Sequence, residues 1–207
     1  MNVEILIGFV TATFLLAISP GPDNIYVLMQ SIVNGLKYGI ATVLGLMTGC
    51  IIHTSLVAFG ASTILQQNPT LFFIIKLLGA LYLVYLAFKV YQSSGSIELG
   101  DSAVPKKSVL ELFKQGFIMN VLNPKVTLFF LALFPGFLFS DSLSEVIQFY
   151  ILGGLFILVS FIVFGAVAVF GGIISESIQK NKNIGVYMKW LQIVVFVGIA
   201  IFIMLTE

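Results

Sequence analysis

The sequence predicts an all-α integral membrane protein with six transmembrane helices arranged as two inverted three-helix repeats. The chain is 59% hydrophobic and 9% charged, with a mean hydropathy of +1.10, whereas roughly a quarter of the residues of a soluble domain are charged. Several apolar segments are long enough to span a bilayer. Prolines interrupt two of these segments near the middle, so we expect helices 1 and 4 to be broken at these proline motifs.

Six apolar segments exceed the roughly 20 residues that a helix needs to cross the hydrocarbon core of a bilayer. They are Ile5–Val33, Tyr38–Leu65, Pro69–Tyr91, Leu112–Phe139, Glu145–Ile174 and Gly185–Leu205. The segments between them are short and polar, so we expect no soluble catalytic domain.

The longest polar segment divides the chain into two halves of three spans each. We predict a first three-helix repeat over residues 1–91, a cytoplasmic linker over residues 92–108 and a second three-helix repeat over residues 109–207. Weak matches between the halves occur in the same order in both. They pair Ser19-Pro20 with Asn123-Pro124, Phe59-Gly60 with Phe170-Gly171, and Lys76 with Lys189. Because three is odd, the second repeat enters the membrane from the opposite face, which makes an inverted repeat. Six ordinary spans without internal symmetry are the alternative.

The distribution of lysine predicts the orientation of the chain in the membrane. All ten basic residues are lysines, and eight of them fall on one side of the predicted spans. These eight are Lys37, Lys89, Lys106, Lys107, Lys114, Lys180, Lys182 and Lys189. Since positively charged loops stay in the cytoplasm, we expect the lysine-rich loops to be cytoplasmic and both termini to be outside. The net charge of +1 does not indicate a nucleic-acid partner.

The first span contains a motif with two prolines and an acid. It consists of Ser19, Pro20, Gly21, Pro22, Asp23 and Asn24. The prolines remove backbone donors and Gly21 widens the accessible backbone angles, so we expect an unwound segment followed by a half-helix that begins near Pro22. A carboxylate near the bilayer centre costs at least ~2.5 kcal/mol, more than a helix cap usually returns. We therefore expect Asp23 to bind a substrate ammonium group or a proton, rather than only to cap the half-helix.

The fourth span contains the second motif, made of Asn120, Asn123, Pro124 and Lys125. The asparagine amides offer donors and acceptors for a polar substrate. Lys125 either binds a carboxylate or balances the charge of Asp23. The alternative without a function is that its long side chain snorkels to the membrane interface. One anion, one cation and several amides match the ammonium and carboxylate groups of an amino acid. We expect the residues of both motifs to form the substrate and ion path.

The second and fifth spans contain other residues of interest. Glycines such as Gly45 and Gly49 let helices approach closely, either for packing alone or for sliding, and they permit a homodimer. Cys50 and His53 share one helical face, but two ligands do not make a metal site. We expect no metal and no cofactor, and we interpret His53 as a structural histidine or a member of a proton relay.

Six spans with Ser-Pro-Gly-Pro-Asp at residues 19–23 and Asn-Pro-Lys at residues 123–125 resemble the lysine-exporter (LysE/RhtB) family of amino-acid exporters, over essentially the whole chain. The resemblance implies efflux of amino acids across the bacterial inner membrane, driven by protons through alternating access. It also implies that the segments around Asp23 and Asn123 form the transport path.

Because Asp23 is the only acidic residue deep within a predicted span, we expect neutral amino acids rather than dibasic ones as substrates. The alternatives are a heavy-metal cation exporter, an intramembrane enzyme and a non-transporting membrane scaffold. Sparse thiols and imidazoles disfavour the first, and the lack of a nucleophile–base pair in the spans disfavours the second. A scaffold would not need ionisable residues at two helix breaks.

Overall fold

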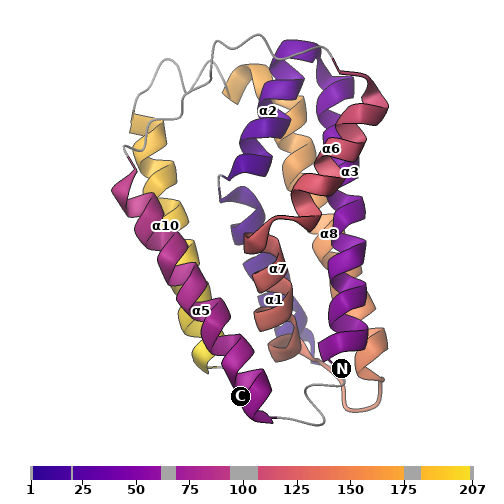
Figure 1. Cartoon of the computed structure of the whole chain (residues 1–207), viewed down its shortest axis with the longest axis vertical. Helices are drawn as coiled ribbons and strands as arrows, with labels where there is room; N and C mark the ends of the chain where they lie inside the picture. Colours follow the sequence, from indigo (N-terminus) through magenta and orange to yellow (C-terminus); the bar gives the residue numbers. More distant parts are fainter. Residues whose placement is uncertain (1, 20, 62–68, 94–106, 175–182, 206–207) are drawn as a thin grey trace.

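The structure is a computed structural model that describes residues 2–19, 21–61, 69–93, 107–174 and 183–205. Every regular element among these residues is helical (Figure 1). Four helices are long and apolar enough to cross a membrane, and the number rises to six if each of two bent helix pairs is one span. The predicted all-α membrane protein is therefore confirmed.

The first half of the chain contains the two parts of a broken span followed by two longer helices. The elements are α1 (Val3–Ile18), α2 (Pro22–Asn34), α3 (Leu36–Leu56), the π-helical turn η1 (Val57–Ala61) and α5 (Pro69–Gln92). The axes of α1 and α2 differ by 60°. The end of the predicted second span, residues 62–65, lies outside the described residues, and Gln92 is the last residue of α5 rather than part of a linker.

The second half repeats this order. Its elements are α6 (Val109–Val121), α7 (Pro124–Leu133), the 3-10 turn η2 (Phe134–Phe137), α8 (Glu145–Val169) and α10 (Asn183–Leu205). The axes of α6 and α7 differ by 50°. Both predicted breaks are confirmed, because α2 restarts at Pro22 and α7 restarts at Pro124. A proline suits this first helical position, where its missing N–H would have no intrahelical partner anyway.

The helices pack as a bundle with α5 and α10 paired along one side (Figure 1). Of the other helices, α5 contacts α7 and α10 contacts α1. Fully buried aromatic side chains from α1, α7, η2 and α8, among them Phe9, Phe130 and Phe134, form the centre of the core. Many apolar side chains on the outer sides of α5 and α10 are exposed, as expected for helices that face lipid.

Glycines set the closest helix contact, between α3 and α6. A Cβ atom at Gly45 would meet the backbone carbonyl oxygen of Phe113, and one at Gly116 would meet that of Thr42. The backbones of the two helices thus touch where the side chains are missing, which is the packing role of small residues in membrane helices. This contact holds the first part of the fourth span firmly against α3.

Candidate functional site

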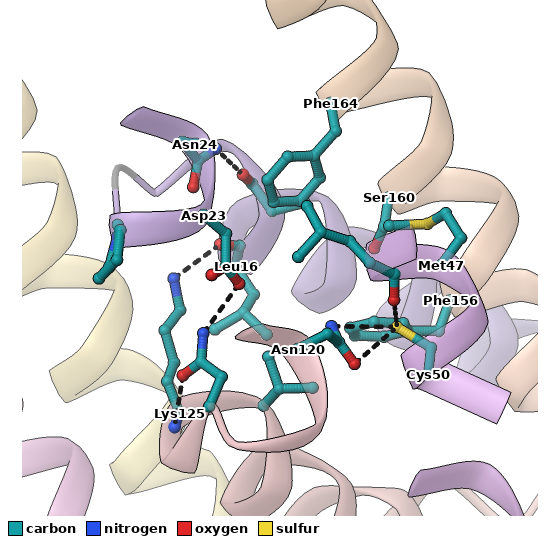
Figure 2. Close-up of a pocket in the computed structure, with 16 residues that line it drawn as sticks. Leu16, Asp23, Asn24, Met47, Cys50, Asn120, Lys125, Phe156, Ser160 and Phe164 are labelled. Atoms are coloured by element: carbon teal, nitrogen blue, oxygen red, sulfur yellow. Dashed lines mark hydrogen bonds between the residues drawn. The ribbon is translucent and has the colours of Figure 1, made fainter. Parts of the chain in front are cut away.

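The two helix breaks face each other near the middle of the bundle and enclose a pocket (Figure 2). Most of the predicted site residues line it, namely Gly21, Pro22, Asp23, Asn24, Asn120, Asn123 and Lys125. Ser19 and Pro124 are not among the lining residues, and Pro20 lies outside the described residues. The sequence motifs from two distant parts of the chain therefore meet in one place.

Asp23 links the two breaks. Its side chain is 7% exposed, and its Oδ2 accepts a hydrogen bond of 2.8 Å from Nδ2 of Asn123. The Oδ1 atom of Asn123 accepts in turn from the backbone N–H of Lys125 at 3.0 Å, which caps α7. The carboxylate thus bonds to the fourth span, and no side-chain hydrogen bond caps the start of α2.

The ammonium group of Lys125 lies on backbone oxygens of the first break. Its Nζ donates to the carbonyl oxygens of Leu16 and Ser19, each at 3.3 Å, and lies 5.4 Å from the centre of the Phe196 ring. Because residue 20 is a proline without an N–H, the carbonyl of Leu16 lacks its usual helical donor. Lys125 replaces this donor and gains a cation–π contact.

No direct ion pair joins Lys125 to Asp23 in the part of the chain that the structure describes. The carboxylate is held by an amide, and the ammonium is held by carbonyl oxygens and an aromatic ring. Two opposite charges therefore line one pocket while each is held by neutral partners. Asn24 completes this side of the site by donating from Nδ2 to the Ala17 carbonyl at 2.8 Å.

The second break is held by α3. Pro124 removes the N–H that would bond to the carbonyl of Asn120, and Nε2 of His53 lies 3.1 Å from that oxygen. A carbonyl oxygen only accepts, so Nε2 of His53 carries the hydrogen. His53 is 3% exposed, and this hydrogen bond favours the structural interpretation, while a part in a proton relay stays a prediction. The signal in the sequence was Pro124, four residues after Asn120. A proline has no N–H to bond to the carbonyl of Asn120, so a donor from elsewhere can take that place.

The side chain of Asn120 is fixed by the same face of α3. Its Nδ2 lies 3.5 Å from Sγ of Cys50, and a Cβ atom at Gly49 would approach its Oδ1 to 2.6 Å. Cys50 and His53 are thus both engaged with Asn120. Among the described residues, no three His, Cys, Asp or Glu side chains come together as metal ligands.

Sequence reasoning missed the far wall of the pocket, which α3 and α8 supply. Met47, Phe156, Ser160 and Phe164 line it, opposite Asp23 and Lys125 in Figure 2. Apart from Glu145 at its first position, the fifth span carries no charge, and it has no proline that would have drawn attention to its three pocket residues.

The pocket is small in this structure, with a cavity volume of about 30 Å³. A cavity of this size has room for about two water molecules. A second cavity of about 510 Å³ lies among α1, α2, α8 and α10, and Asn24 lines both cavities. This volume lies in the usual range of small-molecule sites.

Comparison with known proteins agrees with this architecture. The family described as "LysE type translocator" matches residues 14–207. The chain belongs to this family. Two relatives named "Homoserine/homoserine lactone efflux protein" come from Salmonella typhimurium and Salmonella typhi; they are 32% and 33% identical over 183 residues, which is 88% of this chain and 88% of each relative. No solved structure gives a significant match.

The family consists of translocators, so the chain is a multi-pass membrane transporter. A transporter of this kind moves a small molecule across the membrane.

Proposed function

We propose that the protein exports neutral amino acids from the cytoplasm by proton antiport with alternating access. The observation that carries this proposal is the pair of opposite charges in one pocket, each held by neutral partners. Asp23 suits a substrate ammonium group and Lys125 suits a substrate carboxylate, so the pair is complementary to a zwitterion. A dibasic substrate would need a second acid, and Asp23 is the single acid among the described lining residues. The names of the relatives, which include homoserine, are compatible with this class.

The proposed orientation places the lysine-rich end of the bundle in the cytoplasm of a bacterial cell, at the inner membrane. Those of the eight lysines that the structure describes lie near helix ends in the upper part of Figure 1, away from the two termini; they are Lys37, Lys89, Lys107, Lys114 and Lys189. The larger cavity extends towards this end, because Ile174 and Ile184 line it. In this proposal the larger cavity is the access path from the cytoplasm, and Asn24, which lines both cavities, lies where this path reaches the substrate site.

Helix contacts support inverted repeats over residues 1–91 and 109–207. Exchanging the halves relates α1 to α6, α2 to α7, α3 to α8 and α5 to α10. Under this exchange the contact of α1 with α8 becomes the contact of α6 with α3, and both are present. The contacts of α3 with α8 and of α5 with α10 each join two related helices, so the exchange leaves them unchanged. Other contacts break the pattern: α2 packs on α3 without a comparable contact of α7 with α8, α1 packs on α10 without one of α6 with α5, and α5 packs on α7, whereas α2 and α10 line a cavity between them. Reversal of this asymmetry would close the cytoplasmic path and open the opposite one, which is alternating access.

Coupling to protons follows from competition at one carboxylate. Asp23 can bind a proton or the substrate ammonium group, and each occupant excludes the other. A proton that enters from outside then displaces the substrate outward. Export should accordingly stop when an uncoupler collapses the proton gradient, and export that persists at the same rate would contradict antiport.

A homodimer is part of the same proposal. Gly154 and Gly165 lie on the same side of α8 by helical periodicity, and a Cβ atom at either would meet nothing within 4 Å in a single chain. Such a face of small residues allows a second helix to approach closely. Native mass spectrometry of the detergent-solubilised protein distinguishes a dimer from a monomer.

The decisive experiment measures export from cells loaded with dipeptides, each of which releases two amino acids inside the cell. The medium is assayed for a full panel of amino acids with the native protein, Asp23→Asn and an empty vector. Asparagine keeps the size of the side chain and an oxygen that can accept from Asn123, so we expect normal membrane levels. Export of a few neutral amino acids should fall to the level of the empty vector, because the charge is lost.

Two results would contradict the proposal in different ways. Release equal to that of the empty vector across the whole panel would exclude amino-acid export under these conditions. Export that survives Asp23→Asn would keep the function and remove Asp23 from the transport path.

A further inference from the structure

Ser160 differs from the other polar residues of the pocket because its hydrogen-bonding capacity is unused. It is 1% exposed, it lines the pocket from α8, and its Oγ has no hydrogen-bond partner. A serine within a helix commonly bonds to the carbonyl one turn earlier, but this one does not. Buried hydroxyl groups almost always find a partner, so an unpartnered one inside a cavity indicates a ligand that supplies it.

The other polar side chains of the pocket are already committed. The amide of Asn24 bonds to the Ala17 carbonyl, the amide of Asn123 bonds to Asp23 and caps α7, and the amide of Asn120 contacts Cys50. Of the described lining residues, Ser160 therefore offers the hydroxyl that is free to bind.

The position of Ser160 indicates which part of a substrate it would meet. Asp23 and Lys125 lie on one side of the pocket, and Ser160 lies on the other side, next to Met47 (Figure 2). If the charged pair holds the ammonium and carboxylate groups, the side chain of the amino acid points towards α8. The wall there is apolar apart from Ser160, with Phe156 and Phe164 beside it.

We propose that Ser160 recognises a hydrogen-bonding group on the substrate side chain. The transporter then prefers small amino acids with a side-chain hydroxyl or carbonyl group over aliphatic ones of the same size. This inference rests on the proposed function, since it names the substrate class of the same site. A site that hydrogen-bonds a substrate hydroxyl discriminates against the analogue that lacks it, because the protein group is then left unpaired.

The test compares two amino acids of equal size in the dipeptide-loading assay. Homoserine and norvaline have side chains with the same number of heavy atoms, and only homoserine carries a hydroxyl. The measured quantity is the ratio of their release rates, which cancels differences in protein level. We expect the native protein to favour homoserine and Ser160→Ala to lower the ratio about tenfold, the effect of one hydrogen bond.

Ser31→Ala is the matched control. Ser31 is also buried and its Oγ also lacks a partner, but it does not line the pocket. The ratio should be unchanged in this variant. An unchanged ratio in Ser160→Ala, or an equal fall in both variants, would overturn the role of Ser160 and leave amino-acid export standing. Absence of any release above the empty vector by the native protein would overturn both proposals.

Discussion

The two helix breaks have a similar backbone arrangement but differ in the side chain that bonds to the carbonyl freed by the proline. In each, a proline removes a donor, and a side chain from the other half of the chain bonds to the freed carbonyl. The Leu16 carbonyl of the first break receives the charged ammonium of Lys125, whereas the Asn120 carbonyl of the second break receives the neutral imidazole of His53. Lys125 belongs to the pocket, whereas His53 lies on α3, which is tightly packed against α6.

This difference indicates that the two breaks have different roles in transport. The bonds of Lys125 are within reach of a ligand in the pocket, and a substrate carboxylate can compete for the same ammonium. The second break is held by His53 of α3, which does not line the pocket, so we expect this side of the pocket to keep its shape. We therefore expect the first break to change during transport and the second to hold its shape, and three substitutions test this comparison.

The largest effect is expected from Lys125→Met, which removes the cation but keeps an unbranched side chain. The carbonyls of Leu16 and Ser19 lose a charged donor and Asp23 loses the positive charge nearby, so we expect a loss of about 3 kcal/mol of stability. Thermal unfolding in detergent measures this loss. The double variant with Asp23→Asn should regain part of the stability but no export, because it no longer buries a lone charge. A double variant no more stable than Lys125→Met would show that the two charges do not compensate each other.

Gly49→Ala should have the next largest effect, because it disturbs the second break directly. The added Cβ atom would approach Oδ1 of Asn120 to 2.6 Å and its Cβ to 2.8 Å, so Asn120 must move away from α3. Overpacking of this kind costs about 1–3 kcal/mol, and export should fall with it. The matched control is Gly198→Ala on α10, where the added atom meets nothing within 4 Å. Equal export by both variants would mean that the second break does not need its fixed shape.

His53→Leu should have the smallest effect of the three. It removes a donor to the Asn120 carbonyl, but the backbone N–H of Asn123 also donates to that oxygen, at 3.0 Å. We expect a loss of about 1 kcal/mol in thermal unfolding, as for one hydrogen bond. His53→Gln, which keeps a donor, should recover part of it. If His53→Leu instead abolished export with unchanged stability, His53 would belong to the proton path and not only to the support of the break.

The sequence by itself determined the class of the fold and the location of the breaks. Apolar length fixes where helices can cross a bilayer, and a proline without an N–H fixes where a helix must be interrupted. For this reason the interruptions between Ile18 and Pro22 and between Val121 and Pro124 fall at the predicted proline motifs, and α2 begins at Pro22 as expected. Asp23, Asn123 and Lys125 could also be selected from the sequence, because polar groups inside an apolar span are energetically costly and usually have a function.

Only the tertiary structure decided which residues meet. The bond between Asn123 and Asp23 joins residues separated by 100 positions, and Ser160 enters the pocket from a helix without a motif. A membrane helix is hydrophobic all round, so its sequence does not reveal which face turns inward. That choice depends on close packing, as where Gly45 and Gly116 let α3 and α6 touch and thereby bring His53 to the freed carbonyl of Asn120.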